Sequence, residues 1–336
     1  MDYITLGKTG LKVSRLGFGG IPIQRIDAEG AKELVRRMAD TGINYIDSAR
    51  AYTVSEEYLG YALEGLRDRF ILASKSMALT RDAMAKDIRT SLQNFRTDYI
   101  DLYQVHNPSP QQLEKTVLAP GGALEALLEA KEEGKIGHLG ITAHSTEVFE
   151  RALELDWVET IMFPYNIVEQ QAADLIRKCT EKGIGFICMK PLAGGAIEDA
   201  SLALRYVFSN PDVSVVIPGV AEVKELEANL AAAEDSAPLT GEELQKIDAI
   251  RAKLGSDFCR RCNYCAPCTV GINIANVFLF AGYLERYDLE GWARSRYDTL
   301  PVKASACIEC GLCESRCPYH LPIREKLKIC VEEFGE

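Results

Sequence analysis

Short apolar runs alternate along the chain with longer segments whose apolar residues recur three and four positions apart. The short runs are typical of buried strands and predict eight of them, at residues 16–19, 43–47, 70–74, 99–105, 136–142, 160–163, 185–189 and 213–217. The longer segments predict helices between the strands, most clearly at residues 28–41, 81–95, 125–133 and 169–182. Because repeated strand–helix units give parallel strands, eight of them predict an α/β protein built on a closed (β/α)₈ TIM barrel.

A doubly wound open sheet is the alternative arrangement of the same units. Such a sheet is expected to carry a G-x-G-x-x-G fingerprint in an early strand-to-helix turn, and the sequence GFGG at residues 17–20 lacks that spacing. Upstream of the first strand, residues 3–14 alternate around the turn sequence GKTG at residues 7–10. This pattern predicts an N-terminal β-hairpin ahead of the main fold.

The strand–helix alternation ends near residue 238, and a second domain is expected beyond it. Thr240 and Glu243 predict a capping box for one more helix, at residues 242–254. Gly255 and Ser256 then mark the predicted boundary between a barrel of residues 1–254 and a second domain of residues 255–336. That second domain is rich in cysteine and contains a helical stretch at residues 274–287, so we expect it to be mostly α-helical.

Length and charge limit the function classes. The 336 residues are enough for a barrel and a small module. A net charge of −11, with no basic stripe, argues against nucleic acid and against an anionic membrane surface as partners. No run reaches the ~18 apolar residues of a membrane span, and the first residues lack the pattern of a secretory signal. The sequence therefore predicts a cytoplasmic protein.

Ionisable residues stand where three neighbouring strands end. Asp47 ends the second predicted strand and Tyr52 follows it, Lys75 follows the third strand, and His106 follows the fourth. Because the strands of a barrel present their carboxyl ends at one face, these side chains are expected to meet there. Asp47 would pair with Lys75, and a neighbouring ammonium favours the phenolate form of Tyr52, which suits general acid catalysis. Each residue alone would more often be structural, but their joint occurrence predicts a catalytic group.

Several segments resemble aldo-keto reductases. They are LGKTGLKVSRLGFG at residues 6–19, GINYIDSA at 42–49, DYIDLY at 98–103 with the histidine that follows at 106, and EGKI at 133–136. The resemblance covers roughly residues 3–235. It implies a (β/α)₈ barrel, an NAD(P)(H) cofactor extended across the barrel top, and hydride transfer between the nicotinamide and a small carbonyl or alcohol substrate. It also implies that Asp47, Tyr52, Lys75 and His106 form the catalytic tetrad, with Tyr52 as the general acid or base.

The same resemblance implies cofactor contacts, and the chain departs from the family at several of them. The implied contacts are Gly19, Thr142, Met162, Met189, Pro191, Leu192, Gly194, Ile217, Gly219, Glu225 and Asn229. Family members commonly hold the carboxamide with a Ser-Asn pair and a Gln and stack an aromatic ring on the nicotinamide. Thr142-Ala143, Met162 and Met189 stand at those positions. Glu225 stands where a basic residue often grips a 2′-phosphate, which favours NADH slightly, while the adjacent Lys224 leaves NADPH open.

Eight cysteines form two runs in the tail. The first run is Cys259, Cys262, Cys265 and Cys268, and the second is Cys307, Cys310, Cys313 and Cys317 followed by Pro318. The second run has the spacing of bacterial ferredoxins, in which the Cys-Pro cysteine ligates the other cluster. It predicts two [4Fe–4S] clusters, with Cys317 completing the first set and Cys268 the second. Structural zinc is the alternative. Thr269 follows Cys268 in place of proline, a departure from the ferredoxin pattern.

Together these patterns predict an NAD(P)(H)-dependent oxidoreductase with a C-terminal iron–sulfur module, similar to the ferredoxin-tailed members of the aldo-keto reductase family. The alternative is an iron–sulfur electron-transfer or redox-sensing protein whose barrel is catalytically weak. A redox partner protein at the ferredoxin-like domain is a further hypothesis. The residues do not name the substrate.

Overall fold

The protein consists of two compact units. The computed structural model describes residues 1–336, of which residues 1–192 and 199–239 form the first unit and residues 193–198 and 240–336 form the second. The sequence placed the boundary after residue 254. The predicted and observed boundaries differ by helix α10 (Gly241–Leu254), which the sequence assigned to the barrel and which belongs to the second unit. This helix buries only Ile247, so it has little apolar surface that could pack on a core. Its predicted capping box between Thr240 and Glu243 is present.

The first unit is a parallel barrel, as predicted. Its strands are β3 (Phe18–Gly19), β4 (Tyr45–Asp47), β5 (Ile71–Ser76), β6 (Ile100–His106), β7 (Ile136–Thr142), β8 (Thr160–Pro164), β9 (Gly185–Met189) and β10 (Val215–Ile217). They pair in chain order, all in parallel. Bridges from Leu16 to Val216 and from Gly19 to Gly219 join the first strand to the last. The sheet is therefore closed, which excludes the open doubly wound alternative.

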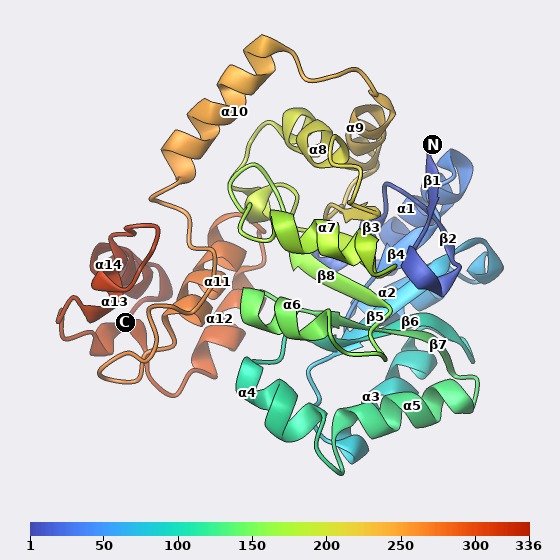
Figure 1. The fold of residues 1–336 in the computed structure, drawn as a ribbon, viewed down its shortest axis with the longest axis horizontal. Coiled ribbons are helices and arrows are strands. Elements are labelled where there is room, and N and C mark those ends of the chain that lie inside the picture. The colour runs from blue at the N-terminus through green and yellow to red at the C-terminus, as the bar shows by residue number, and fades with distance from the viewer. The chain divides into compact units, whose positions relative to one another are not determined.

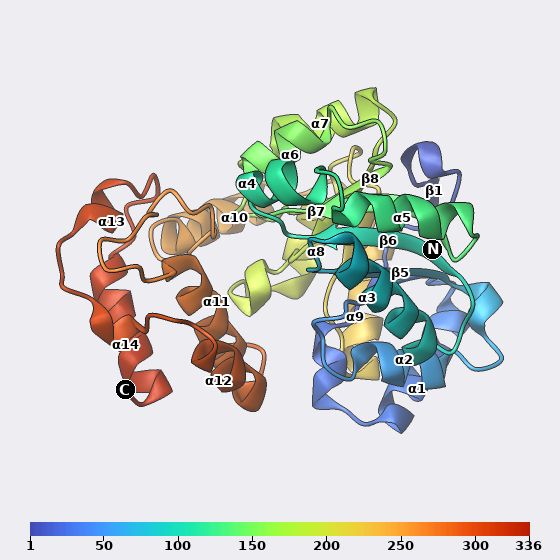
Figure 2. The same cartoon turned by 90° about the horizontal axis from the view of Figure 1, so that it is seen from below.

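Helices surround the strands (Figures 1 and 2). They are α1 (Ala28–Thr41), α2 (Ser55–Ala62), α3 (Arg81–Asn94), α4 (Pro110–Gln112), α5 (Ala123–Glu132), α6 (Thr146–Ala152), α7 (Ala173–Glu181), α8 (Ala200–Phe208) and α9 (Val223–Glu234). Short 3₁₀ turns span Ile21–Arg25 and Arg67–Arg69, and a π-helical turn spans Leu113–Val117. Helix α1 occupies the predicted range because Asp27 caps its first turn and Gly42, at φ 83°, ends it.

The predicted hairpin is present at the end of the barrel where the strands begin. Strands β1 (Tyr3–Thr5) and β2 (Lys12–Ser14) pair in antiparallel fashion across a 3₁₀ turn at Gly7–Thr9. Gly7 packs so closely on the start of β9 that a Cβ atom there would lie 2.2 Å from the backbone nitrogen of Gly185. Leu6 belongs to the apolar cluster inside the barrel. The hairpin therefore covers the N-terminal ends of the strands and leaves the C-terminal ends for chemistry.

Apolar residues fill the barrel in two layers. The larger core lies between the strands and the surrounding helices. A smaller inner core fills the barrel itself, and its buried members are Leu6, Val13, Tyr45, Ala73, Leu102, Met162, Ile187, Val215 and Ile217. Burial of this apolar surface is the main source of stability and fixes the strands that carry the polar residues at the barrel top.

The second unit is mostly helical, as predicted. It contains α10, α11 (Ile274–Glu285), α12 (Glu290–Asp298), a 3₁₀ turn at Ala304–Ala306, α13 (Leu312–Ser315) and α14 (Ile323–Phe334), together with a turn at Ala193–Gly195. A separate core holds it together, in which the rings of Tyr297 and Phe334 stack at 3.8 Å between centroids. None of the helices in either unit is both long and apolar enough to cross a bilayer.

Candidate active site and cysteine sites

The predicted tetrad residues converge at the C-terminal ends of three adjacent strands. Asp47 is the last residue of β4, Lys75 lies one residue before the end of β5, and His106 is the last residue of β6. The loop that carries Tyr52 is tied to β5 because the backbone N–H of Arg50 donates to the Lys75 carbonyl oxygen at 3.0 Å. Tyr52 thereby lies just ahead of α2, over the same end of the barrel.

Contacts among the four residues are direct. The Lys75 ammonium donates to the Asp47 carboxylate and, at 2.8 Å, to the carbonyl oxygen of Ser48. The Lys75 Nζ atom lies 5.0 Å from the centroid of the Tyr52 ring. The His106 ring meets the Tyr52 ring edge-on, with 6.1 Å between centroids and an interplanar angle of 88°. An ion pair, a phenol and an imidazole thus share one small volume.

This cluster is shielded from water. Asp47 and Lys75 are 2% and 1% exposed, and Tyr52 is 8% exposed. Burial raises the pKa of the Asp47 carboxyl and lowers the pKa of the Lys75 ammonium, while their ion pair acts in the opposite direction on both. A buried ion pair of this kind contributes little net stability, but the loss of either partner leaves an uncompensated buried charge. Neither Asp47 nor Lys75 can therefore be replaced by an uncharged residue without cost to the other.

Three further polar residues lie inside the barrel beneath Asp47, and the sequence analysis missed them. The Gln104 amide donates to the second Asp47 oxygen at 3.4 Å. The hydroxyls of Tyr45 and Thr160 and the amide oxygen of Gln104 are buried without a hydrogen-bond partner among the protein atoms. Burial, with the nearby Asp47 charge, raises the pKa of Tyr45. The signal for Gln104 was its position two residues before His106, which places both on the same face of β6.

A second buried carboxylate, Glu56 on α2, was also missed. It is 1% exposed and accepts hydrogen bonds from Arg50 at 2.5 Å, from Ser74 at 2.6 Å and from Ser91 at 2.8 Å. These contacts connect α2, β5 and α3 to the loop that holds Tyr52. Glu56 therefore fixes that loop. From the sequence alone, an acidic residue in the first turn of a helix is expected to be exposed to solvent. Only the packing of Glu56 shows that it is buried and holds the loop.

The residues at the proposed carboxamide position lie on three consecutive strands. Thr142 ends β7, Met162 pairs with it in β8, and Met189 ends β9. Thr142 and Met162 are each 1% exposed. The Thr142 hydroxyl accepts a hydrogen bond from the backbone N–H of Asn107 at 3.0 Å, which leaves its own proton available for donation. One hydroxyl and two thioethers thus stand where the family commonly has two amides, a hydroxyl and an aromatic ring.

Two glycines allow a close approach between the first and last strands. A Cβ atom at Gly19 would lie 2.9 Å from the carbonyl oxygen of Ile217, and one at Gly219 would lie 2.8 Å from Pro22. Ile217 ends β10, so these residues line the seam that closes the barrel. Pro191 and Leu192 directly follow β9 in the sequence.

Two of the predicted cofactor residues, Glu225 and Gly194, have contacts of their own within the protein, and a third, Asn229, is buried. The Glu225 carboxylate accepts from the backbone N–H groups of Ala221 and Glu222, at 2.7 and 3.1 Å, and faces Arg25 at 3.7 Å. Asn229 is buried on α9. Gly194 lies in the segment 193–198 of the second unit, where its carbonyl oxygen accepts from Arg286 at 3.1 Å. Arg25 is a basic residue that the sequence analysis overlooked near Glu225.

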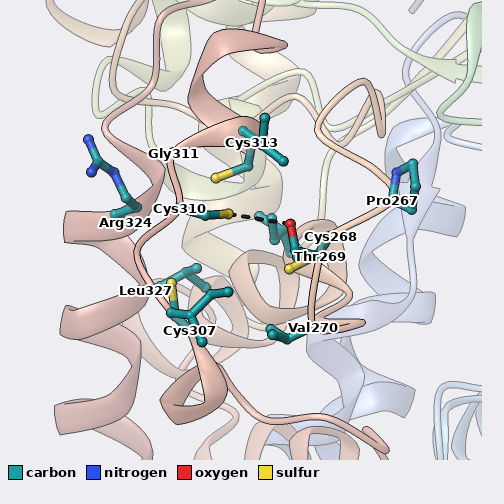
Figure 3. A pocket seen from close by; sticks show the side chains of 13 residues that line it. Pro267, Cys268, Thr269, Val270, Cys307, Cys310, Gly311, Cys313, Arg324 and Leu327 are labelled. Atoms are coloured by element: carbon teal, nitrogen blue, oxygen red, sulfur yellow. Dashed lines mark hydrogen bonds between the residues drawn. The ribbon is translucent and has the colours of Figure 1, made fainter.

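The eight cysteines of the tail separate into two sets of four. One hollow is lined by Cys259, Cys262, Cys265 and Cys317, and another is lined by Cys268, Cys307, Cys310 and Cys313. Each set therefore takes three cysteines from one run and one from the other, which is the exchanged grouping inferred from the sequence. Figure 3 shows the second hollow, with the labelled cysteines around it. Cys330 is buried in the core of the unit and belongs to neither set.

Apolar side chains surround both hollows. Ile274 lines both, Phe278 and Ile323 line the first, and Val270 and Leu327 line the second. Polar side chains line them as well, among them Arg261 and Asn263 in the first hollow and Thr269 and Arg324 in the second. Four cysteine thiolates are the donor set that binds iron–sulfur clusters. The residues present therefore fit two such groups.

The barrel and its polar strand ends define an enzyme of the TIM-barrel class, and comparison with known proteins gives the family. The profile of the aldo/keto reductase family matches residues 15–201 and 198–252, so the chain belongs to that family of oxidoreductases. The profile of a 4Fe-4S dicluster domain matches residues 258–322, which include all eight cysteines. The family uses NAD(P)H. These matches confirm the predicted combination of domains and favour iron–sulfur clusters over zinc.

Individual relatives agree with this assignment. The chain is 28% identical to L-galactose dehydrogenase from Arabidopsis thaliana, over 74% of this chain and 94% of that protein. It is 30% identical to aldo-keto reductase YhdN from Bacillus subtilis, over 63% of this chain and 68% of that protein. Among solved structures, the holo form of aldo-keto reductase AKR11C1 from Bacillus halodurans matches with a TM-score of 0.65 and 27% identity, covering 74% of this chain and 96% of that one.

Proposed function

We propose that the barrel interconverts a small carbonyl compound and its alcohol with NAD(P)(H), and that Tyr52 is the general acid or base. The observation that carries this proposal is the buried Lys75–Asp47 pair set against the Tyr52 ring, with His106 at the edge of that ring. A phenol beside a desolvated ammonium is suited to proton exchange near neutral pH. The membership of the chain in an oxidoreductase family supports the reaction class.

Each tetrad residue has a separate task in this proposal. When bound, a reduced nicotinamide supplies the hydride for the carbonyl carbon. Tyr52 gives its hydroxyl proton to the carbonyl oxygen as negative charge develops there, and it takes that proton back in the reverse direction. Lys75 stabilises the phenolate that remains, and Asp47 keeps the ammonium oriented. His106 donates to the carbonyl oxygen and orients it, while the low exposure of the cluster keeps water away from the reacting atoms.

We further propose that the cofactor lies over Thr142, Met162 and Met189 and extends along the barrel seam at Gly19, Ile217 and Gly219. A thioether packs on a ring face, and the Thr142 hydroxyl donates to the carboxamide. Pro191, Leu192 and Asn229 complete the proposed contacts within the barrel unit.

The Glu225 carboxylate favours NADH because it repels a 2′-phosphate, although Arg25 at 3.7 Å offsets part of that charge. Titration of the holoprotein with NADH and NADPH tests the preference. Tighter binding of NADPH would contradict it.

For the tail we propose two [4Fe–4S] clusters, one held by Cys259, Cys262, Cys265 and Cys317, and the other by Cys268, Cys307, Cys310 and Cys313. The two hollows and the match to a dicluster domain support this assignment. Protein purified without oxygen should be brown and contain about eight irons and about eight sulfides per chain. Zinc in place of iron would refute the assignment.

An electron-transfer or redox-sensing protein with a catalytically weak barrel is the second candidate. Met162 and Met189 at the proposed nicotinamide site favour it, because they remove hydrogen-bonding and stacking partners. In that case a one-electron partner protein would exchange electrons with the clusters.

An anaerobic screen of aldehydes, ketones and alcohols, followed by nicotinamide absorbance, separates the two candidates. Turnover supports the reductase. Failure to bind either NADH or NADPH would sink the reductase and leave the electron-transfer protein.

A further inference from the structure

The second cysteine set departs from the ferredoxin pattern at one position. Cys317 is followed by Pro318, whereas Cys268 is followed by Thr269. Thr269 therefore places a hydroxyl after Cys268, whereas Pro318, at the equivalent position after Cys317, has no hydrogen-bond donor. This residue lies in the lining of the second hollow, next to the cysteine that comes from the first run.

The Thr269 hydroxyl makes a specific contact across the hollow. Its Oγ1 atom lies 3.4 Å from the Sγ atom of Cys310, which is 41 residues away in the sequence. Figure 3 shows this contact as the dashed line between the two side chains. Cys310 is the exposed member of its set, since Cys268 and Cys307 are partly buried and Cys313 is buried. The hydroxyl thus contacts the ligand that lies nearest to solvent.

The direction of this hydrogen bond follows from the chemistry of the ligand. A cysteine that binds iron is a thiolate and carries no proton. It can only accept, so Thr269 donates its hydroxyl proton to Cys310. Reduction of a cluster by one electron increases the negative charge on its sulfur atoms, and a donor to one of them stabilises the reduced state more than the oxidised state. Removal of the donor therefore lowers the reduction potential.

We propose that Thr269 is a tuning residue for the cluster held by Cys268, Cys307, Cys310 and Cys313, and that its hydroxyl raises the reduction potential of that cluster. This inference rests on the proposed assignment of two clusters. Pro318, which holds the matching position after Cys317 in the first set, has no side-chain donor. An electron that enters the unit is held at the second cluster more firmly than it would be with an apolar residue at position 269.

Full-length holoprotein with Thr269→Val or Thr269→Ser tests the proposal. Valine keeps the shape and removes the donor, whereas serine keeps the donor. A potentiometric titration of each protein, with dithionite as the one-electron reductant and EPR detection, gives the midpoint of each cluster. Thr269→Val should lower one midpoint and leave the other unchanged, and Thr269→Ser should keep both. Thr299→Val is the matched control, because Thr299 is exposed in the same unit and its hydroxyl bonds only the Arg296 carbonyl oxygen.

Iron and sulfide analysis separates the possible failures. About eight irons per chain with both midpoints unchanged in Thr269→Val would overturn the role of Thr269 and leave the cluster assignment intact. An equal fall in Thr269→Ser would also overturn it, because the side-chain shape and not the hydroxyl would then matter. Zinc in the wild-type protein would overturn the assignment and the inference together. If Thr269→Val fails to load its clusters, Thr269→Ala removes the same donor with less steric change and is read in the same way.

Discussion

At the scale of single residues, the barrel site is a set of side chains that cannot be buried separately. Lys75 neutralises Asp47, and the same ammonium faces the Tyr52 ring at 5.0 Å. The pair therefore serves two purposes at once: it satisfies its own charges, and it provides a positive field beside a phenol. Substitutions at this scale should affect proton transfer and leave cofactor binding largely intact.

Tyr52→Phe should abolish most of the turnover, because it removes the proposed proton donor and keeps the ring. General acid catalysis contributes roughly 10²- to 10⁴-fold in rate, so kcat should fall by about that factor while the dissociation constant of the nucleotide stays nearly unchanged. Stopped-flow turnover and fluorescence titration measure the two quantities. Retained turnover would mean that another group supplies the proton.

Gln104→Leu should weaken turnover through Asp47. The substitution removes the amide that donates to the second Asp47 oxygen at 3.4 Å, and that hydrogen bond lowers the Asp47 pKa. Without it the pKa of Asp47 rises further, so the acidic limb of the pH–rate profile should move to higher pH. The free energy of unfolding should fall by about 1 kcal/mol. Gln93→Leu, at an exposed position of α3, is the control and should change neither quantity.

The sequence was sufficient to predict that these four residues lie close together, because Asp47, Lys75 and His106 stand at the ends of neighbouring strands and Tyr52 lies in the loop after the first of them. It was not sufficient for Gln104 and Glu56. Gln104 alternates inward like any other strand residue, and its contact with Asp47 depends on the register between β4 and β6. Glu56 becomes buried only because the loop before α2 folds onto β5 and α3. The spacing of Gln104 from His106 indicates only which face of β6 it occupies, and both contacts with other elements depend on the tertiary structure.

At the scale of elements, the spacing of the apolar residues was enough to predict the strands and main helices of the barrel. The eight strands and the main helices lie where the pattern predicts them, with shifts of one or two residues at most ends and four at the start of α7. Helix α2 was not assigned a range, since its buried face includes Ser55 and Glu56 and so lacks an apolar stripe. The π-helical turn at Leu113–Val117 likewise has no counterpart in the apolar pattern.

Glu159, directly before β8, bonds residues of α5 and β7 and should make the stability of the barrel depend on pH in the acidic range. Burial alone would raise its pKa, but hydrogen bonds from His138, Lys131 and the Leu139 N–H outweigh it and lower the pKa of Glu159 to about 2. A carboxylate with a depressed pKa stabilises the folded state above its unfolded pKa of 4.5, and that stabilisation is lost as the pH falls toward about 2.

Glu159→Gln should therefore lower the free energy of unfolding at pH 7, on the order of 2 kcal/mol after allowance for solvent screening. The difference from the wild type should shrink as the pH falls from about 5 to about 2, as measured by urea unfolding of the barrel at each pH. Glu133→Gln is the control, because the exposed pair of Glu133 with Lys135 contributes little. A difference that does not depend on pH would contradict this account.

At the scale of the whole molecule, the two units have separate cores and different sources of stability. The barrel core consists mainly of aliphatic and aromatic side chains, whereas the core of the second unit includes the proposed ligands Cys313 and Cys317. Because clusters held by these thiolates would link distant parts of a small unit, their binding free energy is expected to be part of its folding free energy.

Removal of the clusters should unfold the second unit and spare the barrel. Treatment of the holoprotein with an oxidant and an iron chelator should eliminate the calorimetric transition of the second unit, while the transition of the barrel stays within a few degrees. Scanning calorimetry with far-UV circular dichroism measures both. The simultaneous loss of both transitions would show instead that the barrel depends on the clusters.

The two-domain organisation was predictable from the clustering of cysteine, but the grouping of helix α10 and of residues 193–198 with the second unit was not. Helix α10 has a capping box and is mostly polar, so its sequence does not indicate the unit to which it belongs. The segment 193–198 comes from the loop after β9, far from the tail, and only its contacts with Arg286 and Tyr287 group it with the second unit.

That segment has a consequence for protein engineering. The second unit is discontinuous in the chain, since it takes six residues from a barrel loop as well as the tail. A truncation after residue 239 would leave those six residues without the structure they fold against, and a graft of residues 240–336 onto another barrel would lack them. Any chimera that transfers the tail must therefore transfer the loop after β9 as well.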